Sequence, residues 1–201
     1  MRKRKVSVFL LALGLAAGNF AARAAGAQAG ANPVDKTPPS YDMKPQSLED
    51  LDDMHKKFAS LAEAFPADQF SWRPAPGVRS VAEICLHVAG ENFRYASVLE
   101  TVPARELPKD YERSTTDKAK IVDQLNQSFD YARAAIDKMA NIDFKRPMPK
   151  FGPEANAGDM VYIIVMHTHE HLGQMIAYAR IKGIVPPWTA AAQMSQKKSQ
   201  D

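Results

Sequence analysis

Three of the chain's five histidines lie within five residues, at His167, His169 and His171. Residues 161–174 have the spacing of an α-helix, in which positions four apart project from the same face. His167 and His171 are therefore neighbours on one largely apolar face, whereas His169 lies on the opposite side and is not expected to be a ligand. Two inward-facing imidazoles are costly to protonate, because like charges repel and burial removes hydration. The pair indicates either a divalent-metal site or two core histidines bonded to backbone or buried acids.

A third histidine, His87, lies in a second amphipathic segment that follows a capping-box pattern at Ser80–Glu83. At helical spacing, His87 shares its face with apolar residues, so it too is expected to face the core. Three protein ligands would leave coordination positions open for water or substrate, as in catalytic metal sites. Imidazole nitrogens suit Zn, Ni or Fe. We therefore expect a divalent transition metal held by His87, His167 and His171.

Two glutamates lie close to these histidines in the sequence. Glu91 follows His87 by one helical turn, and Glu170 immediately precedes His171. We consider both as candidate catalytic residues, and Glu91 also as a group that orients His87 or binds the metal. The alternatives are that Glu91 pairs with a neighbouring basic residue and that Glu170 lies on the helix surface. Gln174, one turn after Glu170, is a candidate hydrogen-bond partner for a ligand.

The string from His167 to His171 also matches the HxxEH pattern of inverzincin metalloproteases. That site takes a further ligand, typically a glutamate well downstream. No glutamate follows His171 in the sequence, and Asp201 is the only acid after it. The protease interpretation therefore lacks a ligand. The single cysteine, Cys85, excludes an internal disulfide and a cysteine-rich zinc site, and its position off the His87 face favours a small buried hydrophobe.

The first 29 residues resemble a secretory signal peptide. A basic stretch, Arg2–Lys5, precedes an apolar run that is shorter than the ~20 residues needed to span a bilayer, and small-residue cleavage sites follow. We expect a secreted or periplasmic protein with no stable membrane insertion after cleavage; an uncleaved anchor is the alternative. The formal charge is +3, but much of it lies in this leader. Without the leader's basic residues the chain is slightly acidic, so no nucleic-acid surface is expected.

Residues 30–45 are rich in proline and are expected to form a linker, followed by a helical domain at 46–189 and a disordered tail at 190–201. Apolar residues at helical spacing predict four helices and no strands. The predicted helices are 47–65, one from 80, one from about 116, and 157–182. The long connection 141–158 is expected to form part of a site rim. His55 is expected at a helix edge, away from the site.

Several motifs together resemble the DinB family. They are Ser71–Ser80 (SWRPAPGVRS), Ala82–His87 (AEICLH), His167–Gln174 (HTHEHLGQ), Arg180–Gly183 (RIKG) and Pro186–Trp188 (PPW). The resemblance implies an all-α, up-down-down-up four-helix bundle with a long crossover between its second and third helices. It also implies a three-histidine metal site, which falls on His87, His167 and His171, and it suggests a homodimer.

Two classes of function follow from this sequence. The first is a metal-dependent hydrolase or transferase that acts on a small-molecule substrate; the better-understood relatives of the family are transferases or isomerases that use a low-molecular-weight thiol. The second is a non-catalytic helical bundle that binds a metal or another ligand. The two differ in whether a titratable group lies beside the open side of the metal, and Glu91 and Glu170 are the candidates.

Overall fold

The structure is a computed structural model that describes residues 42–199. The predicted signal peptide at 1–29 and most of the predicted linker lie outside the described residues. Among residues 42–199, no helix combines the length and the apolar composition needed to cross a membrane.

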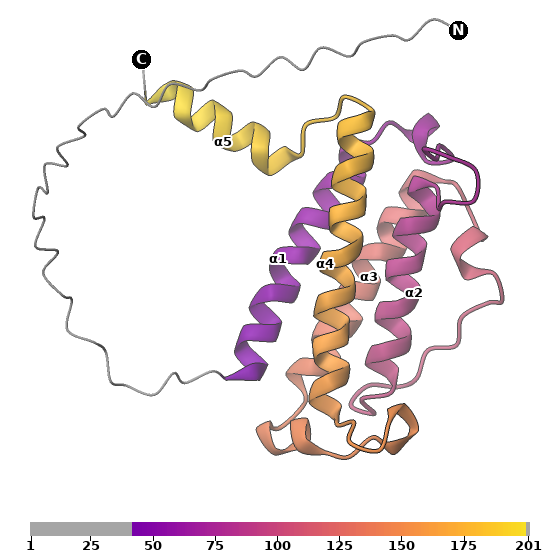
Figure 1. Cartoon of the computed structure of the whole chain (residues 1–201), viewed down its shortest axis with the longest axis vertical. Helices are drawn as coiled ribbons and strands as arrows, with labels where there is room; N and C mark the ends of the chain where they lie inside the picture. The colour runs from indigo at the N-terminus through magenta and orange to yellow at the C-terminus, as the bar shows by residue number, and fades with distance from the viewer. Residues whose placement is uncertain (1–41, 200–201) are drawn as a thin grey trace, which may run out of the picture. The chain divides into compact units, whose positions relative to one another are not determined.

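Helices make up the described part of the chain, as predicted (Figure 1). The five α-helices are α1 (Met43–Ala64), α2 (Val81–Ser97), α3 (Lys118–Asp137), α4 (Ala157–Ile181) and α5 (Pro187–Lys198). Residues 42–199 contain no strand, and their extended pairing is limited to an isolated bridge between Pro147 and Asn156. The all-α prediction is therefore confirmed for the described residues.

The helices that carry the candidate ligands begin at strong capping signals. At the start of α2, the backbone N–H of Glu83 donates to Ser80 Oγ at 3.2 Å, and the N–H of Ser80 donates to Glu83 Oε2 at 2.8 Å. The same reciprocal pattern joins Asn156 and Asp159 at the start of α4. Such a capping box satisfies backbone donors that have no partner within the helix. Both helix starts follow from the sequence within a residue.

Helix α1 begins at Met43, four residues before the predicted start. Its N-cap is Asp42, whose side chain accepts a hydrogen bond from the backbone N–H of Lys44 at 3.2 Å. Pro45, which we assigned to the linker, lies in the first turn of the helix. Proline is tolerated there because first-turn N–H groups have no intrahelical acceptor to lose.

The C-terminal segment also differs from the prediction. We expected a disordered tail from residue 190, but α5 continues to Lys198. Pro187 occupies its first turn, where the fixed φ of proline suits a helix start, and Ala190–Ala192 are strong helix formers. Helix α5 contacts α1, and its residues beyond Ala190 are exposed.

The four longer helices lie side by side, with α1 and α2 each packed against both α3 and α4 (Figure 1). Their shared core contains fully buried side chains from every helix, among them Phe58, Phe93, Phe129 and Ile164. Burying one such side chain contributes roughly 1.5–3 kcal/mol. Because α2 packs directly against α4, this core brings the His87 region beside the two histidines of α4.

The connection between α2 and α3 folds back onto α2. It contains a short 3₁₀ helix, η2 (Tyr111–Arg113), that packs against α2. A Cβ atom at Gly90 would lie 3.1 Å from Tyr111 Cδ1, so the absence of a side chain at Gly90 allows this close approach. The contact holds η2 near His87, which lies one turn before Gly90.

Candidate metal centre

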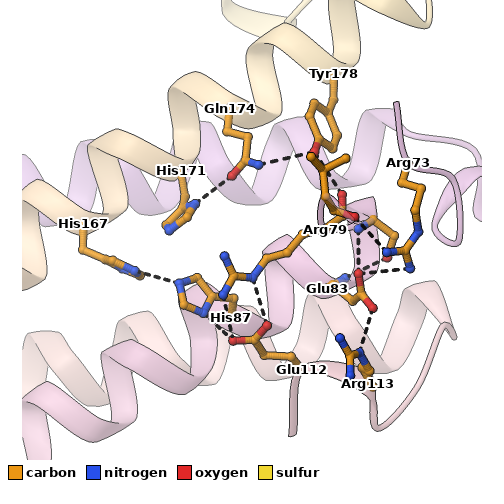
Figure 2. A network of polar contacts seen from close by, with 12 residues as sticks. Arg73, Arg79, Glu83, His87, Glu112, Arg113, His167, His171, Gln174 and Tyr178 are labelled. Atoms are coloured by element: carbon orange, nitrogen blue, oxygen red, sulfur yellow. Dashed lines mark hydrogen bonds and ion pairs between the residues drawn. The ribbon is translucent and has the colours of Figure 1, made fainter. Parts of the chain in front are cut away.

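Three histidines converge between α2 and α4. His87 comes from α2, and His167 and His171 come from successive turns of α4 (Figure 2). Their candidate ligand atoms all lie within 4.8 Å of one another, a grouping able to hold a metal ion. The Nε2 atoms of His87 and His167 are 3.0 Å apart. The three residues predicted from sequence are thus brought together.

Hydrogen bonds on the outer nitrogens orient two of the rings. His87 Nδ1 lies 2.6 Å from Glu112 Oε1, and His171 Nδ1 lies 2.9 Å from Gln174 Oε1. Because a carboxylate or an amide oxygen accepts, each Nδ1 carries the proton and each Nε2 presents its lone pair. Nitrogens on a tetrahedral metal with bonds of 2.0–2.1 Å lie about 3.3 Å apart. The Nε2 separation of His87 and His167 is close to that spacing.

The environment favours neutral imidazoles. Burial, together with the positive charges that His171 and His87 would carry, lowers the pKa of His167 to about 4. Burial also lowers the pKa of His171; the hydrogen bond with Gln174 opposes the shift and the proximity of His87 adds to it. Neutral imidazole is the form that binds metal, so these two rings are ready to act as ligands at neutral pH.

Glu112, in η2, is the carboxylate that holds His87. It also accepts hydrogen bonds from Arg79 Nε at 2.9 Å and Arg79 Nη2 at 3.3 Å. Burial acts to raise the pKa of Glu112, but the hydrogen bonds from Arg79 and His87 outweigh it, and the pKa is lowered. An ionised carboxylate on the far nitrogen of a histidine is a common partner of metal ligands, because it fixes the ring and increases its basicity.

Sequence reasoning missed both Glu112 and Arg79. Glu112 is 25 residues from His87 and lies in a connection without helical periodicity. Arg79 immediately precedes the capping serine of α2, and this position next to a well-defined helix start is the signal that could have drawn attention to it. Nothing in the spacing of Glu112 marks it as a partner of His87.

A second chain of hydrogen bonds leads from His171 to the loop before α2. Gln174 Nε2 donates to Tyr178 Oη at 3.3 Å, and the Tyr178 hydroxyl donates to the carbonyl of Arg79 at 3.0 Å (Figure 2). The ring of Trp72 contacts Tyr178 edge to face, with centroids 5.5 Å apart. Gln174 is thus a hydrogen-bond partner of His171, as expected from the sequence. Through Tyr178 it also connects α4 to the backbone of Arg79.

The two glutamates proposed from sequence lie differently. Glu91 lines the same cavity as His87, but its carboxylate is paired with Arg94, whose Nε donates at 3.0 Å. Glu91 thus pairs with a neighbouring basic residue, which was the alternative to its orienting His87. The carboxylate that bonds to His87 is Glu112. Glu170 is exposed on the outer face of α4. A catalytic role for either glutamate stays a prediction.

The other expected non-ligands lie outside the triad. His169 is exposed. His55 bonds through Nε2 to Asn126 Oδ1 at 2.9 Å and stacks on Phe129, with ring centroids 4.7 Å apart. Cys85 is buried, and burial raises the pKa of its thiol to about 12, so it is no nucleophile at neutral pH.

Two cavities flank the triad. One, of about 380 Å³, lies between α2 and the connection to α3 and is lined by His87 and Tyr111. The other, of about 480 Å³, is lined by Arg79 and Gln174. Glu112 lines both. Either cavity gives a small molecule room beside the histidines.

A cavity of about 720 Å³, larger than these two, lies elsewhere. It is formed by the connection 141–158 and the first residues of α1. His167 is ten residues beyond the start of α4, which places it about 15 Å along the helix axis. No residue of the connection lines either cavity beside the triad. The expectation that 141–158 borders the histidine site is therefore wrong.

Comparison with protein families gives a match to the DinB superfamily. The sequence profile of the DinB superfamily matches residues 50–175, a span that includes the three histidines and Glu112. A search of curated proteins found no match.

Proposed function

The chain belongs to the DinB superfamily, and from this membership and the histidine triad we propose that it is an exported metal-dependent hydrolase or transferase. A divalent transition metal, Zn, Ni or Fe, binds to His87, His167 and His171, and a small-molecule substrate occupies an adjacent cavity. We also propose that α1 to α4 form the up-down-down-up bundle that the family resemblance implies; the packing of α1 and α2 against both α3 and α4 supports this arrangement.

The observation that carries the proposal is the convergence of three ring nitrogens that share a single mutual hydrogen bond among the described residues, between Nε2 of His87 and Nε2 of His167. Glu112 and Gln174 occupy the Nδ1 atoms of His87 and His171, so both rings present lone pairs inwards. Lone pairs facing one another are unfavourable without a proton or a cation between them. A metal satisfies all three nitrogens at once and, when bound, supplies Lewis-acid activation of water or substrate.

The protein residues have separable tasks in this proposal. Glu112 holds the His87 ring, and Gln174 holds the His171 ring. His167 Nδ1 is buried without a hydrogen-bond partner among residues 42–199, so this ring is oriented by packing, including an edge contact with Tyr95, and by the contact of its Nε2 with His87 Nε2. His167 is therefore the least constrained of the three ligands.

Metal content measured on purified protein tests the proposal. We expect one metal ion per chain in wild type and none in His87→Ala or His167→Ala. His169→Ala is the matched control, since it removes an exposed histidine from the same helix and should leave the metal content unchanged. Equal metal content in all three variants would refute the ligand assignment.

The pairing of Glu91 with Arg94 and the exposure of Glu170 favour a second candidate, a metal- or ligand-binding bundle without catalysis. The metal-loaded protein should be screened for hydrolysis and for group transfer, with and without low-molecular-weight thiols. Turnover that disappears with chelator supports the enzyme. A chelator that lowers the melting temperature of a protein without turnover supports the second candidate.

Export and dimer formation complete the proposal. The N-terminal sequence of protein recovered from cells tests export, with cleavage near residues 24–29 expected.

The outer face of α4 exposes Tyr162, Met166 and Ile181, at 59%, 48% and 63% of their surfaces, and we propose that a second copy covers this face. Sedimentation of wild type and of Met166→Glu tests it; a dimer in both would place the interface elsewhere.

A further inference from the structure

Arg79 is held in place beside the histidine triad at both its backbone and its side chain. Its carbonyl accepts a hydrogen bond from the Tyr178 hydroxyl at 3.0 Å. Its guanidinium donates from Nε to Glu112 Oε2 at 2.9 Å and from Nη2 to Glu112 Oε1 at 3.3 Å. Both contacts are part of the network that orients His87 and His171. Arg79 is therefore positioned by the same residues that position two ligands.

One edge of the Arg79 guanidinium has no acceptor. A guanidinium has five N–H groups in a planar fork, and Glu112 accepts from two of them. Among residues 42–199, no atom accepts a hydrogen bond from Nη1. Figure 2 shows this terminal nitrogen pointing away from Glu112 and towards the imidazole of His171. The side chain is 38% exposed and lines the 480 Å³ cavity, which gives a small molecule room beside it.

The other arginines that line the same 480 Å³ cavity are turned to different partners. Arg73 donates to the Val78 carbonyl at 2.8 Å and pairs with Glu83 at 3.1 Å, and Arg113 pairs with Glu83 at 3.2 Å. The cavity thus contains three arginines and two glutamates. Its net charge is positive, which attracts anions. Of the three arginines, Arg79 is the one bonded to a partner of the triad.

We infer that Arg79 binds an anionic group of the substrate, so that the substrate class is a small molecule carrying a carboxylate or a phosphate. The Nη1–Nη2 edge matches the two oxygens of either group, and guanidinium binds both in a bidentate manner. An anion held there lies beside the cavity that Arg79 and Gln174 line, and Gln174 bonds to His171. This inference rests on the proposed function, because it places the anion beside the metal.

The test uses full-length protein loaded with Co(II), whose visible absorption changes when a ligand enters the metal site. Inorganic phosphate, acetate and neutral imidazole are titrated into wild type, Arg79→Gln, Arg79→Lys and Arg133→Gln. Arg133 is a matched control, because its Nε donates to Asp52 at 2.9 Å and its side chain is 45% exposed, in a pair away from the triad. Cobalt content and circular dichroism are measured on every sample.

We expect Arg79→Gln to bind phosphate or acetate roughly 10- to 100-fold more weakly than wild type, because a charged hydrogen-bonding edge is lost. Arg79→Lys keeps the charge without the planar edge and should be intermediate. Imidazole binding and the behaviour of Arg133→Gln should match wild type. Comparison of the phosphate and acetate titrations tells which oxyanion is preferred.

Three outcomes would overturn the inference. Unchanged phosphate and acetate affinity in cobalt-loaded Arg79→Gln would show that Arg79 binds no anion, while leaving the metal proposal intact. An equal loss of imidazole binding would show a general disturbance of the site. A wild-type protein that binds no cobalt would refute the proposed function itself, and the inference would fall with it.

Discussion

The protein contains two half-buried histidine environments with opposite hydrogen-bonding states. Between α1 and α3, His55 bonds to Asn126 and stacks on Phe129, so both its ring face and its Nε2 have protein partners. Between α2 and α4, the outer nitrogens of His87 and His171 are bonded, whereas their Nε2 atoms face His167 and one another. The polar atoms of the first environment are paired with protein groups, whereas the second is a grouping of three nitrogens that could hold a metal ion.

This difference shows which feature of a helical histidine indicates metal. Burial and an apolar face are common to both environments and do not separate them. The distinguishing feature is the carboxylate or amide oxygen that accepts a hydrogen bond from Nδ1. This bond fixes the tautomer and directs the lone pair of Nε2 inwards. Glu112 and Gln174 provide it at the triad. His55 has an amide partner on Nε2 itself, so that nitrogen is not free to bind metal.

The largest expected difference between the two environments is in metal binding itself. His171→Ala should abolish stoichiometric metal binding, since it removes one of three ligands. His55→Ala should retain full stoichiometry and lose only stability, because it removes a stacked ring. Isothermal titration with Zn measures the first effect, and thermal unfolding measures the second. Loss of metal binding in His55→Ala would contradict the proposed difference between the His55 environment and the triad.

Glu112→Gln tests the carboxylate on His87. The change keeps the shape of the side chain and removes its charge, so the His87 ring loses basicity and support from Arg79. We expect metal affinity to fall roughly 10- to 100-fold. Glu91→Gln is the control, because Glu91 is paired with Arg94 and makes no bond to His87. Competition with a chromophoric chelator measures the metal affinity of both variants. A larger loss of affinity in Glu91→Gln would mean that Glu91, and not Glu112, is the carboxylate that supports His87.

Burial of the histidine triad should also make the stability of the metal-free protein depend on pH. The pKa of His167 falls from 6.5 in a model peptide to about 4 in the folded chain. Between these values the unfolded state binds more protons than the folded state, so the metal-free protein should lose stability as pH falls from about 6.5 to 4. Urea unfolding of His167→Ala should show a shallower loss over this window. An equal slope in wild type and His167→Ala would contradict the pKa shift.

The smallest effect is expected from the outer end of the α4 chain. Tyr178→Phe removes the hydroxyl that joins Gln174 to the Arg79 carbonyl and leaves the ring packed against Trp72. One neutral hydrogen bond contributes about 1 kcal/mol, so metal affinity should fall less than about tenfold. If Tyr178→Phe bound metal more weakly than Glu112→Gln, Gln174 rather than Glu112 would contribute more to the orientation of the ligands.

Much of the fold and of the triad could be predicted because local sequence determines them. The capping box at Ser80 and the terminal Gly183, with φ of 73°, mark helix boundaries through short-range hydrogen bonds and backbone conformation. His167 and His171 are four residues apart on one helix, so their proximity follows from helical geometry. Only the approach of His87 required packing between helices.

The outer partners could not be predicted in the same way. Glu112 reaches His87 because the connection after α2 folds back, with Asp110 at a positive φ of 55° and Tyr111 packed on Gly90. These are tertiary features without a periodic signal in the sequence. Glu91 was the nearer candidate along the helix, but Arg94 lies three residues away and takes its carboxylate. Local spacing therefore predicted the three histidines that the fold brings together, but it did not reveal Glu112, the carboxylate that bonds to His87.

The most direct test of the account is a crystal structure of the zinc-loaded full-length chain, with anomalous data collected at the zinc edge. We predict one anomalous peak between α2 and α4, about 2.0–2.1 Å from Nε2 of His87, His167 and His171. A zinc-loaded protein without a peak at this position, or with His87 turned away from the ion, would contradict the central claim.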